Sequence, residues 1–96
     1  MYVFIGVQEN ESPSIVTSPV SRTAKLYESV ILSCEAAGSP PPIIQWYKDD
    51  ESLDFIGGEY TIASIKPTDR GQYHCTASSS GFQTATSAKA LVLIEG

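Results

Sequence analysis

The sequence predicts an all-β domain, and two stretches of the chain carry this prediction. Apolar or small side chains occupy every second position from Val30 to Ala36, and again from Tyr73 to Ala77. Successive side chains of a strand face opposite ways, so each stretch is expected to turn one row of side chains inward. Each inward row contains one of the two cysteines, Cys34 and Cys75. If the two strands lie in facing sheets, these cysteines can be joined.

Six residues, in their order and spacing, resemble the immunoglobulin superfamily. They are Cys34, Trp46, Asp69, Gly71, Tyr73 and Cys75. The resemblance implies a Greek-key sandwich of two antiparallel sheets, with Trp46 packed against a Cys34–Cys75 disulfide. It also implies a tyrosine corner, in which the Tyr73 hydroxyl bonds the backbone a few residues upstream. We expect Asp69 to cap a tight turn and Gly71 to permit the bend.

The state of the two cysteines bears on the compartment of the protein. A bond between positions 34 and 75 would stabilise the domain by about 4 kcal/mol in the chain-entropy model. It would also imply an oxidising compartment, hence an extracellular protein, either secreted or at the cell surface. The alternative is a pair of reduced, buried thiols in a cytoplasmic domain of a muscle-type scaffold protein.

Charge and composition argue against nucleic acid and against catalysis. The formal net charge is −5, and the six basic residues are scattered along the chain, whereas phosphate and anionic membrane surfaces need clustered Lys and Arg. The only histidine, His74, is expected on an outward position of a flat strand, where it joins no metal cluster and no Ser/His/Asp set. We therefore expect no cofactor, no metal site and no enzymatic activity, but recognition of a protein partner.

Residues 1–12 are expected to form an apolar N-terminal extension and linker ahead of a domain over 13–96. Met1–Val7 is apolar and too short to span a bilayer. One hypothesis is that it pairs with a sheet of its own or a neighbouring domain, giving a dimer; the alternative is a leader that is disordered in solution. Asn10 begins an N-glycosylation sequon, although Pro13 directly after it should lower its use.

From Pro13 onward the pattern resembles an I-set domain. The expected strands are 14–17, 21–26, 30–36, 43–48, 53–56, 59–62, 73–77 and 84–94. Family members usually have glycine seven positions before the first cysteine, where this chain has Tyr27. Because tyrosine resists the positive φ that glycine allows, we expect this turn to differ from the usual form of the family.

The span from Trp46 to Cys75 is short for an I-set domain, so the strand called D is expected to be short or absent. One sheet should then hold strands 14–17, 30–36 and 59–62, with Tyr60, Ile62 and Ile65 reaching the core. The other should hold 21–26, 84–94, 73–77, 43–48 and 53–56. The last strand alternates imperfectly, since Ala88, Ala90 and Val92 fit one face while Leu91 and Leu93 fit the other. A bulge or a second packed neighbour would account for this.

Four carboxylates gather after the strand at 43–48: Asp49, Asp50, Glu51 and Asp54. The spacing of a calcium loop is missing, so a solvated turn is the interpretation we prefer. The alternative hypothesis is an acidic rim that steers a basic partner.

The resemblance to adhesion and receptor domains implies binding through the outward face of the G-F-C-C′ sheet. On this sequence that face would present Ile43, Gln45, Tyr47, Gln72, His74 and Thr76, with Phe82 at the rim of a hairpin. Tyr47 beside His74, flanked by Ile43 and Phe82, is a candidate hot spot, because aromatic side chains anchor protein interfaces. The alternative is a set of ordinary exposed residues on an unused sheet. The partner could be another copy of the chain or a different protein, and adhesion, receptor and factor-binding roles all stay open. The alternative class of function is a structural unit of an intracellular scaffold.

Overall fold

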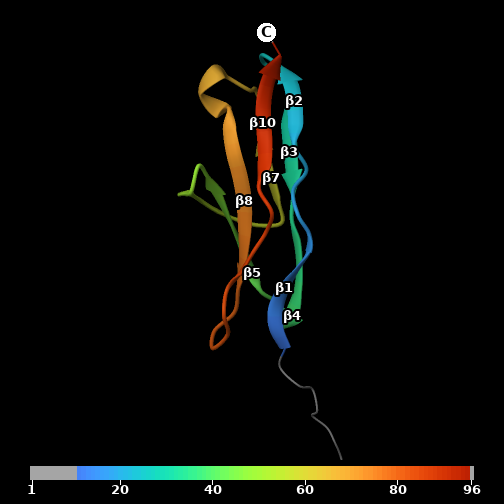
Figure 1. Cartoon of the computed structure of the whole chain (residues 1–96), viewed down its shortest axis with the longest axis vertical. Helices are drawn as coiled ribbons and strands as arrows, with labels where there is room; N and C mark the ends of the chain where they lie inside the picture. The colour runs from blue at the N-terminus through green and yellow to red at the C-terminus, as the bar shows by residue number, and fades with distance from the viewer. Residues whose placement is uncertain (1–10, 96) are drawn as a thin grey trace, which may run out of the picture.

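The computed structural model describes residues 11–95, which fold into two facing layers of β-strands (Figure 1). The elements are β1 (Glu11–Thr17), β2 (Arg22–Lys25), β3 (Val30–Ser33), β4 (Glu35–Ser39), β5 (Ile43–Lys48), β6 (Glu51–Ile56), β7 (Glu59–Ile62), the 3₁₀ turn η1 (Pro67–Asp69), β8 (Gly71–Ser78), β9 (Ala85–Thr86) and β10 (Ala90–Glu95).

The larger sheet has the strand order β2-β10-β8-β5-β6, with β9 paired to β8. Within it, β10 runs parallel to β2 and antiparallel to β8. In the other layer β1 pairs with β4, and β3 pairs with β7. The all-β sandwich and the predicted division of strands between its two sheets are therefore confirmed.

Several strand boundaries differ from the prediction. Strand β1 begins at Glu11, two residues inside the predicted linker, while the division of the chain at residue 13 stays a prediction. The strand expected at 30–36 is interrupted at Cys34 and then continues as β4 to Ser39. The last strand is interrupted over 87–89, where the Ser87 hydroxyl accepts the Cys75 N–H at 3.0 Å. This interruption resets the alternation, so Ala90 and Val92 are buried while Ala88 is exposed.

Strand D is absent, as predicted. Only Gly57 and Gly58 separate β6, in the larger sheet, from β7, in the other layer. Three hydrogen bonds hold this crossing. The Trp46 indole N–H donates to the Gly57 carbonyl at 2.8 Å, Gly57 N–H donates to Ile44 O at 2.9 Å, and Cys34 N–H donates to Gly58 O at 2.8 Å. Gly57 has φ +148°, a backbone conformation that glycine adopts readily.

The core lies around a disulfide between Cys34 and Cys75, with an S–S distance of 1.98 Å and Cα atoms 6.5 Å apart. Trp46 has no exposed surface, and it is the cross-strand neighbour of Cys75 on the adjacent strand. Leu32, Ile65 and other apolar side chains from both layers complete the cluster. The two layers are thus joined by one covalent bond and by the apolar residues packed around it.

Tyr73 and Asp69 fix the turn that leads into β8. The Tyr73 hydroxyl donates to the Asp69 carbonyl at 2.6 Å, four residues upstream. Burial, reinforced by the Asp69 charge, raises the pKa of Tyr73, so the hydroxyl keeps its proton and remains a donor. The Asp69 carboxylate reaches back to accept the Lys66 N–H at 2.8 Å, and so caps η1 from its last residue rather than from its start. Gly71 has φ +154°, and a Cβ there would lie 2.8 Å from an Asp49 carboxylate oxygen.

The prediction for the turn at Tyr27 is wrong. Tyr27 has φ +74°, the left-handed conformation that tyrosine was expected to resist. The surrounding bonds impose it, because Tyr27 N–H donates to Ile65 O at 2.9 Å and Glu28 N–H donates to Lys25 O at 3.0 Å. The tyrosine ring is 73% exposed, so it contributes little packing in return.

We expect Tyr27→Gly to stabilise the domain. A left-handed φ costs an L-residue roughly 1–2 kcal/mol, and glycine gives back roughly 0.5–1 kcal/mol through its greater freedom in the unfolded chain. The expected net gain is about 0.5–1 kcal/mol, measured as a higher urea midpoint. Tyr27→Ala is the matched control, because it keeps the left-handed backbone and should not gain stability. A glycine variant no more stable than the alanine variant would contradict this account.

Candidate protein-binding face

Strands β5 and β8 lie in the middle of the larger sheet and position most of the candidate residues. They run antiparallel, which places Tyr47 opposite His74 and Gln45 opposite Thr76. Side chains directly opposite each other in such a pair are close enough to contact. The outward face of this sheet therefore has a row of cross-strand pairs.

Tyr47 and His74 form a stacked pair on this face. Their ring centroids are 4.9 Å apart, and the ring planes differ by only 5°. The Tyr47 hydroxyl also lies 3.5 Å from the Gln45 side-chain oxygen, at the limit of a hydrogen bond. Tyr47 remains half-buried, so part of its ring is available to a partner. An aromatic side chain held in one orientation has little conformational entropy left to lose on binding.

The acidic residues form a two-residue hairpin turn beside this pair. Asp49 and Asp50 have φ +50° and +69°, the backbone signs of a type I′ turn between β5 and β6. Asp49 accepts the Gln72 N–H at 3.0 Å. The Asp50 carboxylate lies 3.2 Å from the Lys89 ammonium and 4.0 Å from His74 Nδ1. All four carboxylates of this stretch are exposed, so the turn is solvated and acidic.

The structure corrects the prediction that His74 and Thr76 are exposed. Their relative exposures are 7% and 8%. Both residues are on the outward side of β8, but neighbouring strands cover them. The Tyr47 ring lies on His74, and Thr76 sits between Gln45 of β5 and Thr86 of β9. A central strand flanked on both sides buries short side chains even on the outer face of a sheet.

His74 is a buried histidine whose Nδ1 atom has no hydrogen-bond partner among residues 11–95. Burial lowers the pKa of His74, because a desolvated site disfavours the charged imidazolium. Lys89 lowers this pKa further, while Asp50 acts in the opposite direction. The Tyr47 ring, which carries no charge, stacks on the imidazole. The imidazole is therefore neutral at neutral pH.

We expect the domain to lose stability as pH falls below the ordinary histidine pKa of roughly 6.5. The unfolded chain binds a proton there, whereas the native state, with its lowered pKa, does not, so acid favours unfolding until the folded pKa is reached. Because His74 is the only histidine, His74→Gln should flatten this slope. Urea midpoints at about pH 7.5 and pH 5.5 measure it. A wild-type midpoint that is unchanged or rises in acid would contradict the sign.

The remaining candidates are spread along the face. Ile43 is 51% exposed and pairs with Ser78, at the end of the sheet next to the hairpin that contains Phe82. Four strand positions, about 13 Å, separate it from Tyr47. Ile43 therefore belongs with the hairpin end of the sheet and does not flank Tyr47. Gln72 is exposed and lies opposite Leu91.

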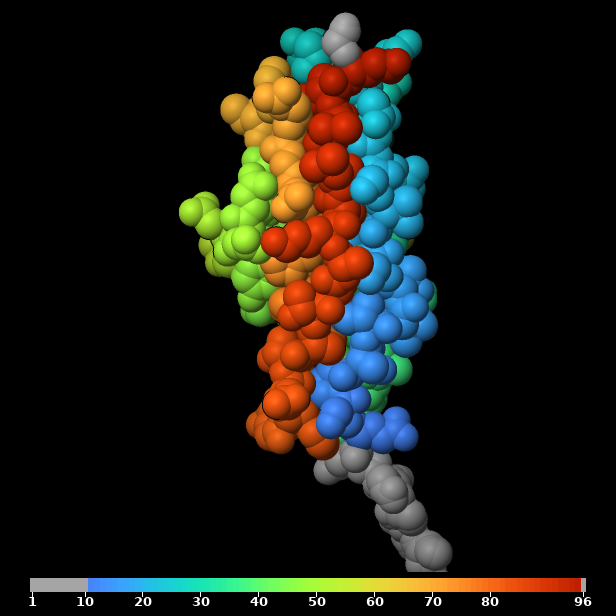
Figure 2. Space-filling view, in the orientation of Figure 1, coloured from blue at the N-terminus to red at the C-terminus, as the bar shows by residue number. Residues whose placement is uncertain are grey.

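Two exposed leucines of β10 were missing from the predicted face. Leu91 and Leu93 are 39% and 43% exposed, while the alternate residues Ala90 and Val92 are buried. Figure 2 shows β10 (red) lying between β8 (orange) and β2 (cyan). The imperfect alternation of the last strand was the signal for them, since it placed both leucines on the face opposite the core.

Other predicted features are located as follows. Asn10 and the apolar segment Met1–Val7 lie outside the described residues, so glycosylation and a dimer through this segment stay predictions. Within residues 11–95, no three His, Cys, Asp or Glu side chains gather into a metal site. The described part of the chain also contains no helix of the length and hydropathy needed to cross a membrane.

The fold, the disulfide and the buried tryptophan define the class of this protein as an immunoglobulin-like β-sandwich. A family model described as "Immunoglobulin domain" matches residues 12–79. The chain belongs to this family.

Similar proteins include Protogenin and Protein sidekick-1, and similar solved structures include Dlar and titin. The chain is 35% identical to rat (Rattus norvegicus) Protogenin over 85% of its length, and 34% identical to human (Homo sapiens) Protein sidekick-1 over 79%. It spans only 8% and 4% of those proteins. Among solved structures, the tandem Ig repeats of Dlar match 94% of the chain with 25% identity and a TM-score of 0.83, and this chain covers 51% of that structure. A chimeric titin Z1Z2 structure matches 92% with 33% identity and a TM-score of 0.75, and the chain covers 99% of it.

Proposed function

We propose that this domain is a non-enzymatic recognition module of a secreted or cell-surface protein, and that it binds a protein partner through the outward face of the β10-β8-β5-β6 sheet. The observation that carries the proposal is Tyr47, held on His74 at the centre of that face. Partner-binding interfaces favour a rigid aromatic anchor with polar groups around it. Gln45 and the Asp50–Lys89 ion pair supply those polar groups.

The rest of the face adds apolar area at two places. Ile43 and Phe82 lie toward the hairpin end, and Leu91 and Leu93 lie on β10. The acidic turn at Asp49 and Asp50 adds negative charge at one rim. A partner with an apolar centre and a basic edge complements this arrangement. Whether that partner is another copy or a different protein is part of the test.

The test uses the full chain, tethered through its C-terminus as a fluorescent tetramer, on an array of extracellular domains that includes the chain itself. Tyr47→Ala should weaken binding to a specific partner by about tenfold or more, since a hot-spot truncation costs at least about 2 kcal/mol. Tyr27→Ala is the matched control, because it removes an exposed tyrosine from a turn away from this face. Unchanged binding by the Tyr47 variant would refute the proposed face.

The disulfide supports the extracellular compartment of this proposal. A bonded Cys34–Cys75 pair belongs in an oxidising environment. The relatives Protogenin and Protein sidekick-1 agree with an adhesion or receptor role.

The 33% identity to titin Z1Z2 favours a second candidate, a structural domain of an intracellular scaffold. The two candidates differ in the redox state of the native protein. Thiol trapping in freshly lysed cells, followed by intact mass with and without reduction, distinguishes them. A trapped pair of thiols would favour the scaffold.

A further inference from the structure

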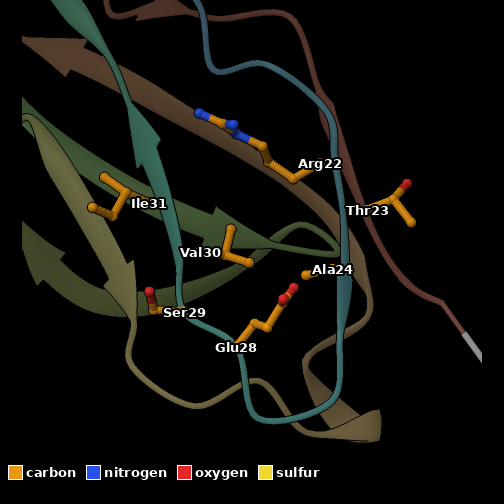
Figure 3. A pocket seen from close by; sticks show the side chains of 7 residues that line it. All are labelled: Arg22, Thr23, Ala24, Glu28, Ser29, Val30 and Ile31. Atoms are coloured by element: carbon orange, nitrogen blue, oxygen red, sulfur yellow. The ribbon is translucent and has the colours of Figure 1, made fainter.

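A groove opens between the two layers along β2 and β3, away from the Tyr47 face. Its volume is about 280 Å³, and residues of β2, the following turn and β3 line it. Figure 3 shows Arg22 extending from β2 into the groove and Glu28 pointing into it from the turn, whereas Thr23 points away. Ala24 and Val30 are buried and form its apolar floor. The groove follows from the strand order. Strand β1 pairs with β4 in one layer, and the chain then crosses to β2 in the other layer, so β2 and β3 face each other without being paired.

In the part of the chain that the structure describes, β2 pairs with β10 alone, so its backbone is unpaired there on the side that faces this groove. Lys25 N–H donates to the Glu28 carboxylate at 2.9 Å and Lys25 O accepts the Glu28 N–H at 3.0 Å, so Lys25 turns its backbone groups away from β10. Backbone groups alternate sides along a strand. Thr23 therefore also directs its N–H and C=O away from β10, toward an edge where no described strand is paired with it.

Strand β3 is unpaired in the same way. Cys34 N–H donates to Gly58 O, and Glu28 O accepts the Ile65 N–H, so the even-numbered residues of this segment direct their backbone groups toward β7. By alternation Ile31 directs its N–H and C=O to the opposite edge. Among residues 11–95, β3 pairs with β7 alone, so no strand of that range pairs with the Ile31 N–H and C=O beside the groove.

The charges in the groove favour an acidic occupant. The Glu28 carboxylate keeps its negative charge near the turn, where it accepts the Lys25 N–H, and Figure 3 shows the Arg22 guanidinium apart from it. Arg22 makes no ion pair with any residue in the range 11–95. A guanidinium without a partner is complemented by a carboxylate, which it can bind through two hydrogen bonds. An extended segment with one acidic side chain between apolar ones would thus fit the groove. Its carboxylate would face Arg22, its apolar side chains would face Ala24 and Val30, and its backbone would face Ile31.

We infer that this groove is a β-strand docking site for an extended, acidic peptide segment of another protein. The segment pairs its backbone with Ile31 at the free edge of β3, places a carboxylate on Arg22 and rests apolar side chains on Ala24 and Val30. Backbone pairing supplies affinity in such strand addition, and the side-chain pockets supply specificity. The site is separate from the Tyr47 face, so the chain would hold two partners at once.

The probe is the N-acetylated, C-amidated heptapeptide Thr-Val-Thr-Glu-Thr-Val-Thr, titrated against the full ¹⁵N-labelled chain. The counterpart has Lys in place of Glu. We expect the acidic peptide to shift the Ile31 and Thr23 amide resonances, and to bind about tenfold more tightly than the basic one. No shift at millimolar peptide, equal affinity for both peptides, or shifts confined to the free edge of β6 would overturn the site.

Matched variants test each contact. Arg22→Glu should reverse the preference between the two peptides, whereas Lys25→Glu, the same charge change on the same strand, should leave it. Ile31→Pro removes the free N–H without touching the β7 ladder and should abolish the peptide-induced shift at Thr23, while Ile31→Val should retain the shifts at both positions. Tyr47→Ala should not change the binding of either peptide. The peptide titration can therefore contradict this inference without contradicting the proposed function, and the reverse also holds. If Arg22→Glu instead changes the sedimentation of the chain alone, the occupant is a second copy and the inference is wrong.

Discussion

Replacing both cysteines, Cys34→Ala with Cys75→Ala, should lower the free energy of unfolding by about 4 kcal/mol. The bond closes a loop of 41 positions, so losing it restores the conformational freedom of that loop to the unfolded chain. Both sulfurs are buried in the core, and alanine leaves their space unfilled. Because small domains have only about 5–15 kcal/mol in total, this loss is a large share of the stability of the domain.

Urea unfolding measures this loss. Wild-type protein reduced with a phosphine should show a similar decrease, since it too lacks the bond but retains the sulfur atoms. The difference between the reduced wild type and the double variant then isolates the packing of the sulfurs. A loss below about 1 kcal/mol in the double variant would show that the bond does not constrain the unfolded chain as the entropy model requires.

Trp46→Ala should cost about 3–5 kcal/mol. The indole has no exposed surface, and its ring centroid lies 6.0 Å from that of Tyr60 in the opposite layer. Its N–H also holds the Gly57 carbonyl at the crossing between the sheets. Removing it therefore opens a cavity beside the disulfide and leaves a carbonyl without its donor.

Trp46→Phe separates these two contributions. Phenylalanine retains a large ring but has no N–H, so the orphaned carbonyl should cost about 1–3 kcal/mol. Amide exchange at Gly57 and Gly58 provides a readout besides stability, because the crossing should open more often in this variant. Exchange equal to that of the wild type would indicate that the bond to Gly57 does not restrain the crossing.

The candidate face was predicted only in part. Alternation placed Tyr47 and His74 on one side of adjacent strands, and the structure stacks them. The same alternation made His74 and Thr76 look exposed, although cross-strand neighbours bury both. The contact between Asp50 and Lys89 joins residues far apart in the sequence, so no local pattern could have indicated it.

By itself the sequence determined the sandwich, the division of strands between its sheets, the missing strand D and the pairing of the cysteines, because each follows from alternation, spacing and family motifs. Tertiary structure alone decided the left-handed φ of Tyr27, the burial of His74 and the open groove between β2 and β3. The reason is that backbone strain, side-chain exposure and unpaired strand edges depend on which neighbours arrive from distant parts of the chain.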